Sequence, residues 1–312
     1  MTAREATPKQ CLQTILEGGI PQYPPHWELV FQIEREFFGM DTKVLDPKHY
    51  SSQEAYQRAV YDHQFEVYSR LVDGCGWAAV RGGYDPEEVR IGKRRIGDRA
   101  LLAGYEGDGV FWMPSGADIM DFVVQLYEKP NELHAEAREK CDTARMMLTR
   151  LADAGADFFV LTYDFGFNDA PFVSPDQFRE FVTPYLTELV QHAHDLGKKV
   201  ILHSDGCITQ ILDQIHGTGI DGYQSVDPQG HMDIKEVRAS YPDWILMGNV
   251  ACNMLQDFDD TKIRESVRYC MEYGGVGARY IFSTSNCIFA GMPPESYRTM
   301  LNEYHRLIGL PD

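Results

Sequence analysis

From about residue 156 onward, short apolar runs alternate with amphipathic segments of helical length. Strands that alternate with helices of this length form consecutive βα units around a parallel sheet, so the pattern predicts an α/β fold. With 312 residues, 44% of them hydrophobic, the chain has the size of one α/β barrel with added segments, and we expect a single domain over residues 1–312. The predicted strands are Phe158 to Tyr163, Val200 to His203, Gly222 to Ser225, Ile245 to Gly248 and Tyr280 to Ser283.

The segments between these runs carry helix boundary signals. Ser174, followed by a proline and then by Gln177, predicts a helix start with a capping box. The helix should break or bend at Pro184, and a second helix should continue to Gly197. We also predict a helix over 205–218.

The N-terminal half has a weaker pattern. Trp27 to Phe31 resembles a strand entered through two prolines, and Gly76 to Val80 resembles a second strand. Charged and glycine-rich pieces over about 88–114 favour a hairpin inserted into the barrel over a βα unit. Glu132 to Asp153 predicts a charged amphipathic helix.

Charge and cysteine usage exclude several classes of partner. The formal net charge is −18, which repels nucleic-acid backbones and anionic membrane surfaces, so neither is an expected partner. No apolar run reaches the roughly 20 residues that cross a bilayer. Seven cysteines without a regular framework favour a reducing compartment, and we expect a cytoplasmic protein.

The run Val200 to His203 ends in a histidine that is followed two residues later by Asp205. Residues i and i+2 share a face of a strand, and the carboxyl ends of parallel strands usually carry the chemistry of α/β proteins. His203 is therefore a candidate catalytic residue. The alternative is a histidine held by Asp205 for packing alone.

A second candidate cluster follows the strand that begins at Phe158. Asp164 could bind a metal, transfer a proton or hold a polar substrate, and Tyr163, Phe165 and Phe167 could enclose a flat ligand. The alternative is a loop whose aromatic residues only cap the barrel.

Cys287 joins His203 and Asp205 as a possible third metal ligand. Imidazole and thiolate favour zinc, a carboxylate can complete the set, and three protein ligands leave a position open for substrate. A buried cysteine that only fills space is the alternative.

The first predicted strand offers further candidates. His26 and Glu28 share a face, and Glu28 on the inner face would be a buried carboxylate that needs a partner or a catalytic task. The other candidate substrate-binding residues are His26, Trp27, Gln224 and Asn249.

The region from Gly155 to about Tyr304 resembles the uroporphyrinogen decarboxylase superfamily, especially its corrinoid-dependent methyltransferase branch. The motifs that carry the resemblance are Gly155-Ala156-Asp157, Ser174-Pro175 with Phe178 and Phe181, Pro184-Tyr185, His203-Ser204-Asp205-Gly206, Gly219-Ile220-Asp221-Gly222, Met247-Gly248-Asn249 and Pro293-Pro294-Glu295-Ser296-Tyr297. The resemblance implies a TIM-type (β/α)8 barrel, here with an N-terminal extension and the inserted hairpin, whose active site lies at the C-terminal mouth of the strands.

The methyltransferase branch holds zinc with a His-x-Cys pair and a later cysteine, and a separate corrinoid protein delivers or receives the methyl group. His203 and Cys287 occupy the first and third ligand positions, whereas the middle position is Asp205, which departs from the family pattern. The arginine-rich N-terminal signature of the decarboxylases is missing, and a chain this acidic is a poor partner for a substrate with eight carboxylates.

We therefore expect a corrinoid-dependent methyltransferase that moves a methyl group from a small donor, an aryl methyl ether in the favoured case, to the cob(I)alamin of a partner corrinoid protein. Asp164, Glu28 or a zinc ion could activate the leaving oxygen. The alternatives are methyl transfer from the corrinoid to a thiol or to tetrahydrofolate, decarboxylation of a tetrapyrrole, and non-catalytic corrinoid binding. If the protein forms an oligomer, the expected state is a homodimer.

Overall fold

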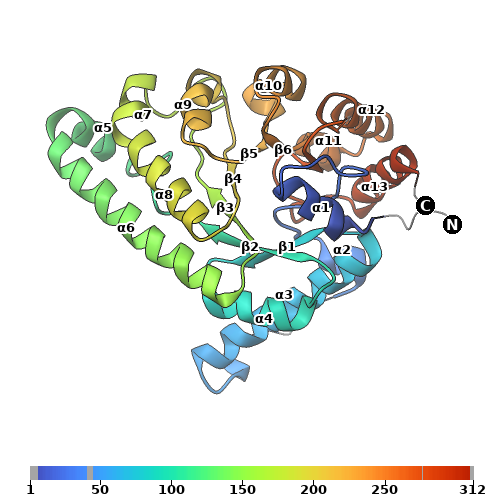
Figure 1. Ribbon diagram of the computed structural model, residues 1–312. Helices are drawn as coiled ribbons and strands as arrows, with labels where there is room; N and C mark the ends of the chain where they lie inside the picture. Colours follow the sequence, from blue (N-terminus) through green and yellow to red (C-terminus); the bar gives the residue numbers. More distant parts are fainter. Residues whose placement is uncertain (1–5, 41–44, 276, 310–312) are drawn as a thin grey trace.

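The computed structural model describes residues 6–40, 45–275 and 277–309. Its centre is a curled, seven-stranded parallel sheet in sequence order, with helices on its outer side (Figure 1). The strands are β1 (Ala79–Gly83), β2 (Leu101–Glu106), β3 (Phe158–Thr162), β4 (Val200–His203), β5 (Gly222–Ser225), β6 (Ile245–Val250) and β7 (Tyr280–Thr284). The predicted α/β class and the five strands from residue 158 onward are confirmed.

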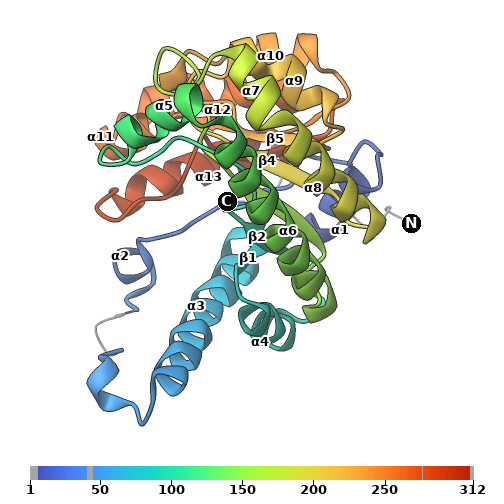
Figure 2. The same cartoon turned by 90° about the vertical axis from the view of Figure 1, so that its left-hand side faces the viewer.

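Helices cover the outer face of the sheet, and α3 projects from the body of the molecule (Figure 2). None of the helices in the described ranges combines the length and the apolar character that crossing a membrane requires. The helices are α1 (Pro8–Leu16), α2 (Glu34–Phe38), α3 (Gln53–Cys75), α4 (Pro86–Ile96), α5 (Ile119–Glu128), α6 (Pro130–Ala154), α7 (Pro175–Phe181), α8 (Thr183–Asp195), α9 (Leu212–Gly217), α10 (Ile234–Ser240), α11 (Cys252–Asp257), α12 (Asp260–Cys270) and α13 (Pro294–Ile308), with 3₁₀ turns at Pro47–His49, Thr209–Ile211 and Pro228–Gly230 and a π-helical turn at Met271–Gly275.

The predicted first strand lies between the two edges of the sheet, although it does not form a regular strand. His26 makes single parallel bridges to Trp77, just before β1, and to Phe282 in β7. Two prolines precede His26 and provide no backbone N–H groups, so no ladder bond can be donated at those two positions. An eight-stranded barrel is therefore not formed by the described residues, and the segment around His26 takes the place of the eighth strand.

The predicted inserted hairpin is wrong. Residues 86–96 form α4, and β2 then pairs in parallel with β1, so this region is an ordinary βα unit. Gly92, which favoured a hairpin, lies inside the helix, where a Cβ atom would stand 2.5 Å from Leu102 and 2.6 Å from Phe65. A glycine that signals a turn in the sequence thus serves close packing of a helix on the sheet. The helix α1 is the N-terminal extension that precedes the sheet.

The predicted helix boundaries are confirmed around α7 and α8. Ser174 and Gln177 form the capping box, and the break between the two helices falls near Pro184. The predicted helix over 205–218 is wrong in its first part, because helical turns begin only at Thr209. The residues before Thr209 instead form the loop that carries Asp205.

Candidate functional site

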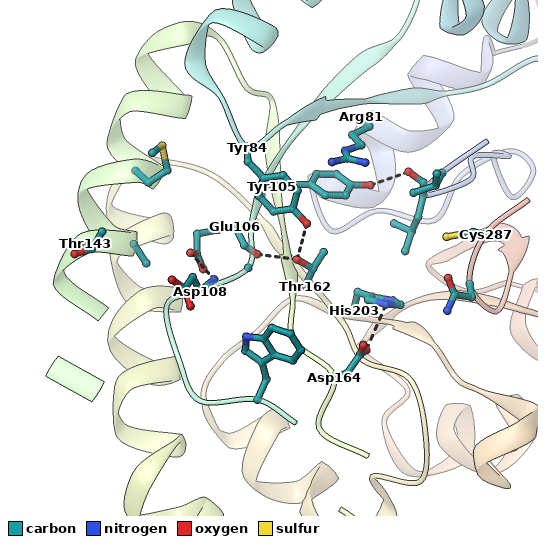
Figure 3. A pocket seen from close by; sticks show the side chains of 17 residues that line it. Arg81, Tyr84, Tyr105, Glu106, Asp108, Thr143, Thr162, Asp164, His203 and Cys287 are labelled. Carbon is teal, nitrogen blue, oxygen red and sulfur yellow. Dashed lines mark hydrogen bonds and ion pairs between the residues drawn. The ribbon is translucent and has the colours of Figure 1, made fainter. Parts of the chain in front are cut away.

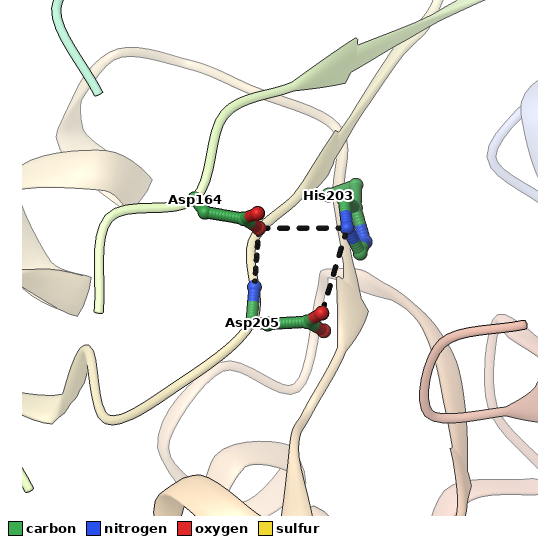
Figure 4. Close-up of side chains that lie close together, drawn as sticks. All are labelled: Asp164, His203 and Asp205. Atoms are coloured by element: carbon green, nitrogen blue, oxygen red, sulfur yellow. Dashed lines mark hydrogen bonds and ion pairs between the residues drawn. The ribbon is translucent and has the colours of Figure 1, made fainter. Parts of the chain in front are cut away.

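Three titratable side chains meet where β3 and β4 end (Figure 4). Nε2 of His203 lies 3.6 Å from Oδ1 of Asp164 and 3.9 Å from Oδ2 of Asp205. The backbone N–H of Asp205 donates to Oδ1 of Asp164 over 3.0 Å, which fixes the two loops relative to each other. One imidazole nitrogen therefore faces two carboxylates.

Glycines allow the loops that carry the two aspartates to approach so closely. Gly206 has φ +79°, and a Cβ atom there would stand 2.2 Å from the carbonyl oxygen of Gly166. A Cβ atom on Gly166 would stand 2.8 Å from the backbone nitrogen of Cys207. Backbone therefore packs against backbone at this rim, which a larger residue would prevent.

A hydrogen-bond chain from β5 sets the orientation of the His203 ring. Nε2 of Gln224 donates to the carbonyl oxygen of Ser285 over 3.1 Å, and this bond assigns the amide nitrogen of Gln224. Its Oε1 therefore accepts from Nδ1 of His203. With the hydrogen on Nδ1, neutral His203 presents a lone pair on Nε2 to the two carboxylates.

Asp205 has one oxygen with a partner and one without. Asn286 donates to Oδ2, whereas Oδ1 is buried and has no well-formed hydrogen bond among the described residues, although the Ser225 side chain acts on the carboxylate as a hydrogen-bond donor that lowers its pKa. Burial raises the pKa of Asp205 above its usual value, the negative charge of Asp164 adds to the shift, and His203 opposes it. A bound cation or proton would relieve both the burial and the repulsion.

These residues fit a divalent metal ion. One ligand atom each from Asp164, His203 and Asp205 lies within 4.8 Å of the others, and imidazole nitrogen and carboxylate oxygen are both among the donors that bind zinc. The structure thus groups Asp164, in place of Cys287, with His203 and Asp205. Burial raises the pKa of the Cys287 thiol, so this side chain is neutral as it stands.

The cluster opens on a cavity of about 590 Å³ (Figure 3). Its wall, as far as the described residues form it, combines aromatic rings with one arginine and several acids, a lining that suits a small, flat, partly polar ligand. The lining residues are Leu29, Val30, Arg81, Tyr84, Tyr105, Glu106, Gly107, Asp108, Trp112, Thr143, Ala144, Met147, Thr162, Asp164, His203, Asn286 and Cys287.

Comparison with known proteins shows which family this chain belongs to. Residues 110–307, more than half of the chain, match the uroporphyrinogen decarboxylase (URO-D) family. The chain belongs to the uroporphyrinogen decarboxylase family. Curated relatives include the uroporphyrinogen decarboxylases of Chlorobium limicola, 24% identical over 230 residues, and of Methylococcus capsulatus, 25% identical over 235 residues. These matches cover 70% and 71% of this chain but only 63% and 64% of the relatives.

Among solved structures, a methyltransferase from Methanosarcina mazei aligns with 97% of this chain and 99% of its own, with a TM-score of 0.76 and 15% sequence identity. At this identity the likeness concerns the fold alone. The URO-D fold of this chain is thus shared over nearly its whole length with a protein that bears the name methyltransferase.

The aromatic residues predicted to enclose a ligand lie elsewhere in the URO-D fold. Trp27 packs edge-on against Phe158 in the core. Phe165 is buried against neighbouring phenylalanines, and Tyr163 is buried with its hydroxyl donating to Glu106. Phe167 is 43% exposed and does not line the cavity. These four are not part of the cavity wall, so a direct substrate contact there is not supported by the geometry.

His26 and Glu28 are buried and also lie outside the cavity lining. Nδ1 of His26 bonds to the carbonyl oxygen of Phe282 and Nε2 to the hydroxyl of Tyr297, each over 2.9 Å. Glu28 accepts from Oγ1 of Thr284 over 2.6 Å and from its backbone N–H over 3.0 Å. Both side chains therefore hold the first segment to β7, and the predicted catalytic role of Glu28 has no geometric support.

The remaining two predicted residues have different surroundings. Gln224 contacts His203 and positions its ring without lining the cavity. Nδ2 of Asn249 donates to the carbonyl oxygen of Val226 over 2.7 Å, and Asn249 lines a separate cavity of about 650 Å³. Asn249 is therefore not part of the cluster around His203.

The sequence did not single out four residues that form much of the cavity wall, namely Arg81, Tyr84, Tyr105 and Trp112. The signal for Arg81 is a charged residue inside the short run Ala79–Gly83, which is otherwise built of small and apolar residues. Tyr105 lies in β2, inside the region assigned to a hairpin, so its strand-end position could not be recognised.

Proposed function

We propose that this protein is a methyltransferase that takes a methyl group from a small aryl methyl ether and passes it to the reduced cobalt of a corrinoid on a partner protein. The observation that carries the proposal is the cluster of Asp164, His203 and Asp205, because Asp164 and His203 also line an aromatic-walled cavity. Membership of the URO-D family and the fold shared with a methyltransferase support it.

The cluster suits the difficult part of ether cleavage. When the methyl group leaves, the C–O bonding pair stays on the oxygen, and that oxygen must gain a proton or a bound cation. A divalent metal held by Asp164, Nε2 of His203 and Asp205 would supply Lewis acidity, and the corrinoid would supply the nucleophile. Without a metal, Nε2 of His203, which lies 3.6 Å from Asp164 and 3.9 Å from Asp205, would be the atom that passes a proton to the leaving oxygen.

Two observations favour demethylation over methyl transfer to a thiol and over decarboxylation of a tetrapyrrole. Transfer to a thiol needs a thiolate-rich metal site, whereas the cluster contains two carboxylates and no thiol. A decarboxylase substrate with eight carboxylates needs several cations, whereas Arg81 is the only arginine or lysine among the described lining residues, which also include Glu106 and Asp108.

The direct test is a screen of methoxylated aromatic compounds with cob(I)alamin, followed by the absorbance change that accompanies its methylation, with metal analysis of the purified protein. Replacement Asp164→Asn should lower the rate by about 100-fold or more, because it removes a charge from the activating group. The matched control is Asp169→Asn, an exposed carboxylate in the same loop, which should leave the rate unchanged. Transfer from no donor, or full activity of Asp164→Asn, would contradict the proposal.

Cys287→Ser separates this reading from a thiol-activating zinc enzyme. If Asp164, His203 and Asp205 hold the metal, the variant should keep its metal content and much of its methyl-transfer rate. Metal analysis beside the wild-type protein provides the measurement. Loss of both metal and activity would instead place Cys287 among the ligands and favour thiol chemistry.

A further inference from the structure

Arg81 occupies an unusual position for a cation. It lies in the middle of β1, and its side chain lines the cavity (Figure 3). The guanidinium carbon lies 5.2 Å from the ring centroid of Tyr84 and 5.2 Å from that of Tyr105. Two aromatic rings therefore contact the guanidinium, and its hydrogen-bonding edges stay available.

The guanidinium of Arg81 makes neither a hydrogen bond nor an ion pair with any other residue in the described ranges, and its Nε atom is buried without a partner. Arg238 is a largely buried arginine whose Nε atom likewise has no partner, yet its Nη atoms donate to the carbonyl oxygens of Trp244 over 2.7 Å and of Arg279 over 3.0 Å. Burying a charged group without such partners costs free energy. The exception at Arg81 therefore points to a partner that the protein itself does not provide.

The acids near Arg81 are engaged elsewhere. Glu88 acts on Arg81 only through space, accepts from Nε2 of Gln64 over 3.1 Å, and has its pKa raised to about 7 by burial. Asp108 pairs with Nζ of Lys140 over 2.8 Å. Glu106 accepts from the backbone N–H groups of residues 108 and 109. None of these carboxylates forms an ion pair with the guanidinium.

We propose that Arg81 binds a carboxylate on the methyl donor, so that the donor is an anionic aromatic compound and not a neutral ether. The planar guanidinium matches a carboxylate with two parallel hydrogen bonds. The inference rests on the proposed function for the nature of the donor, and the requirement for one carboxylate comes from Arg81 alone. One cation suits one carboxylate, even in a chain whose net charge is −18.

The proposal also orients the donor in the cavity. In Figure 3, Arg81 lies at the top of the labelled lining and Asp164 at the bottom, with Tyr105 and Thr162 at heights between them. A donor whose carboxylate contacts Arg81 would extend its methoxy group toward Asp164 and His203, and its ring would lie along the tyrosines. Arg81 would thus select the substrate and position its reacting end.

Binding of two matched probes tests the proposal without a corrinoid or a methyl-transfer assay. Calorimetry should show that the wild-type protein binds 4-methoxybenzoate about 10- to 100-fold more tightly than 4-methoxybenzamide, which has nearly the same shape and no charge. Arg81→Gln should abolish this preference and leave the affinity for the amide within about twofold. Arg81→Lys should keep part of the preference, because it retains the charge and loses the planar geometry.

Arg298→Gln is the matched control, since Arg298 also lies over an aromatic ring, that of Phe37, but outside the cavity lining. It should keep the wild-type preference, and thermal melting should show that each variant is folded. The proposal is overturned if wild-type protein does not bind 4-methoxybenzoate at millimolar concentration, binds both probes equally, or keeps its preference in Arg81→Gln. A preference for the benzoate without any methyl transfer would instead overturn the proposed function and leave the role of Arg81 intact.

Discussion

At the scale of single residues, His26 and Glu28 are a buried pair whose neutral forms the fold favours. Nε2 of His26 lies 3.9 Å from Oε1 of Glu28, and both side chains are fully buried. Burial lowers the pKa of His26 to about 3 and raises the pKa of Glu28 to about 8, although bonds from Thr284 oppose the second shift. The two shifts make opposite contributions to the dependence of stability on pH.

For Glu28, the folded state binds more protons than the unfolded state between pH 4.5 and about 8. Its contribution to stability is therefore complete below pH 4.5 and is lost as the pH rises toward and through 8. Glu28→Gln removes this titration and keeps an oxygen that can accept from Thr284. We expect the stability of the wild-type protein relative to Glu28→Gln to fall by a few kcal/mol, in order of magnitude, between pH 5 and pH 9.

Denaturant unfolding at several pH values measures this difference. The exposed Glu128 provides a control, since Glu128→Gln should follow the wild-type pH profile. Parallel profiles for wild type and Glu28→Gln would show that Glu28 does not titrate as described. His26, whose folded pKa is lowered from 6.5, gives the reverse slope between about pH 3 and 6.5 in both proteins.

At the scale of elements, the start of α7 depends on a local hydrogen-bond pair. Oγ of Ser174 accepts from the backbone N–H of Gln177 over 3.3 Å, and Oε1 of Gln177 accepts from the backbone N–H of Ser174 over 3.1 Å. Ser174→Ala should lower the free energy of unfolding by about 1 kcal/mol. The backbone N–H of Gln177 loses its acceptor, and the reciprocal bond to the backbone N–H of Ser174 is no longer supported by a capping box. Ser174→Asp keeps a capping oxygen and should stay within a few tenths of wild type. Equal losses in the two variants, measured by denaturant unfolding, would contradict a capping role.

The same scale shows which elements the sequence could predict. Strands β3 to β7 are short buried runs between amphipathic helices. Each of them can be recognised from the apolar residues of its own short segment. In α4, by contrast, many residues are charged, and Gly92 in the middle of the segment is a residue that disfavours helices. The helical pattern of apolar residues is therefore difficult to recognise in the sequence. The fit of Gly92 against Phe65 and Leu102 depends on tertiary contacts, which no local pattern reports.

The candidate site divides in the same way. His203 and Asp205 could be predicted because they lie at and just beyond the end of a recognisable strand, and Asp164 because it follows another. Which of Asp164 and Cys287 approaches them depends on loop paths fixed by Gly166 and Gly206. The cavity wall at Arg81 and Tyr105 required the correct topology of β1 and β2, so it emerged only from the structure.

At the scale of the whole molecule, the two edges of the sheet meet through the segment around His26. The backbone N–H of Ala78 donates to the carbonyl of His26 over 2.9 Å, and that of Phe282 donates to the carbonyl of Pro25 over 2.9 Å. From α13, Tyr297 adds a hydroxyl that accepts from Nε1 of Trp77 over 2.9 Å. Few hydrogen bonds therefore connect the two edges of the sheet. The hydroxyl of Tyr297 joins Trp77, beside β1, to His26 in the connecting segment.

Removing that hydroxyl should loosen both edges together. Nδ1 of His26 donates to the carbonyl oxygen of Phe282, so the neutral ring accepts at Nε2 from Tyr297. In Tyr297→Phe, Nε2 of His26 and Nε1 of Trp77 both lose a buried partner, and we expect a loss of about 2–4 kcal/mol in the free energy of unfolding.

Denaturant unfolding measures the loss of stability in Tyr297→Phe, and hydrogen exchange shows where in the sheet it occurs. The amides of Ala78 and Phe282, on opposite edges of the sheet, should exchange faster by similar factors in Tyr297→Phe. The amide of Ser204, which donates to Gln224 inside the sheet, should change less. Tyr127→Phe removes an exposed hydroxyl and should change neither stability nor exchange. Faster exchange at one edge alone would mean that the segment around His26 is attached to each edge independently, and that the sheet is not closed as a unit.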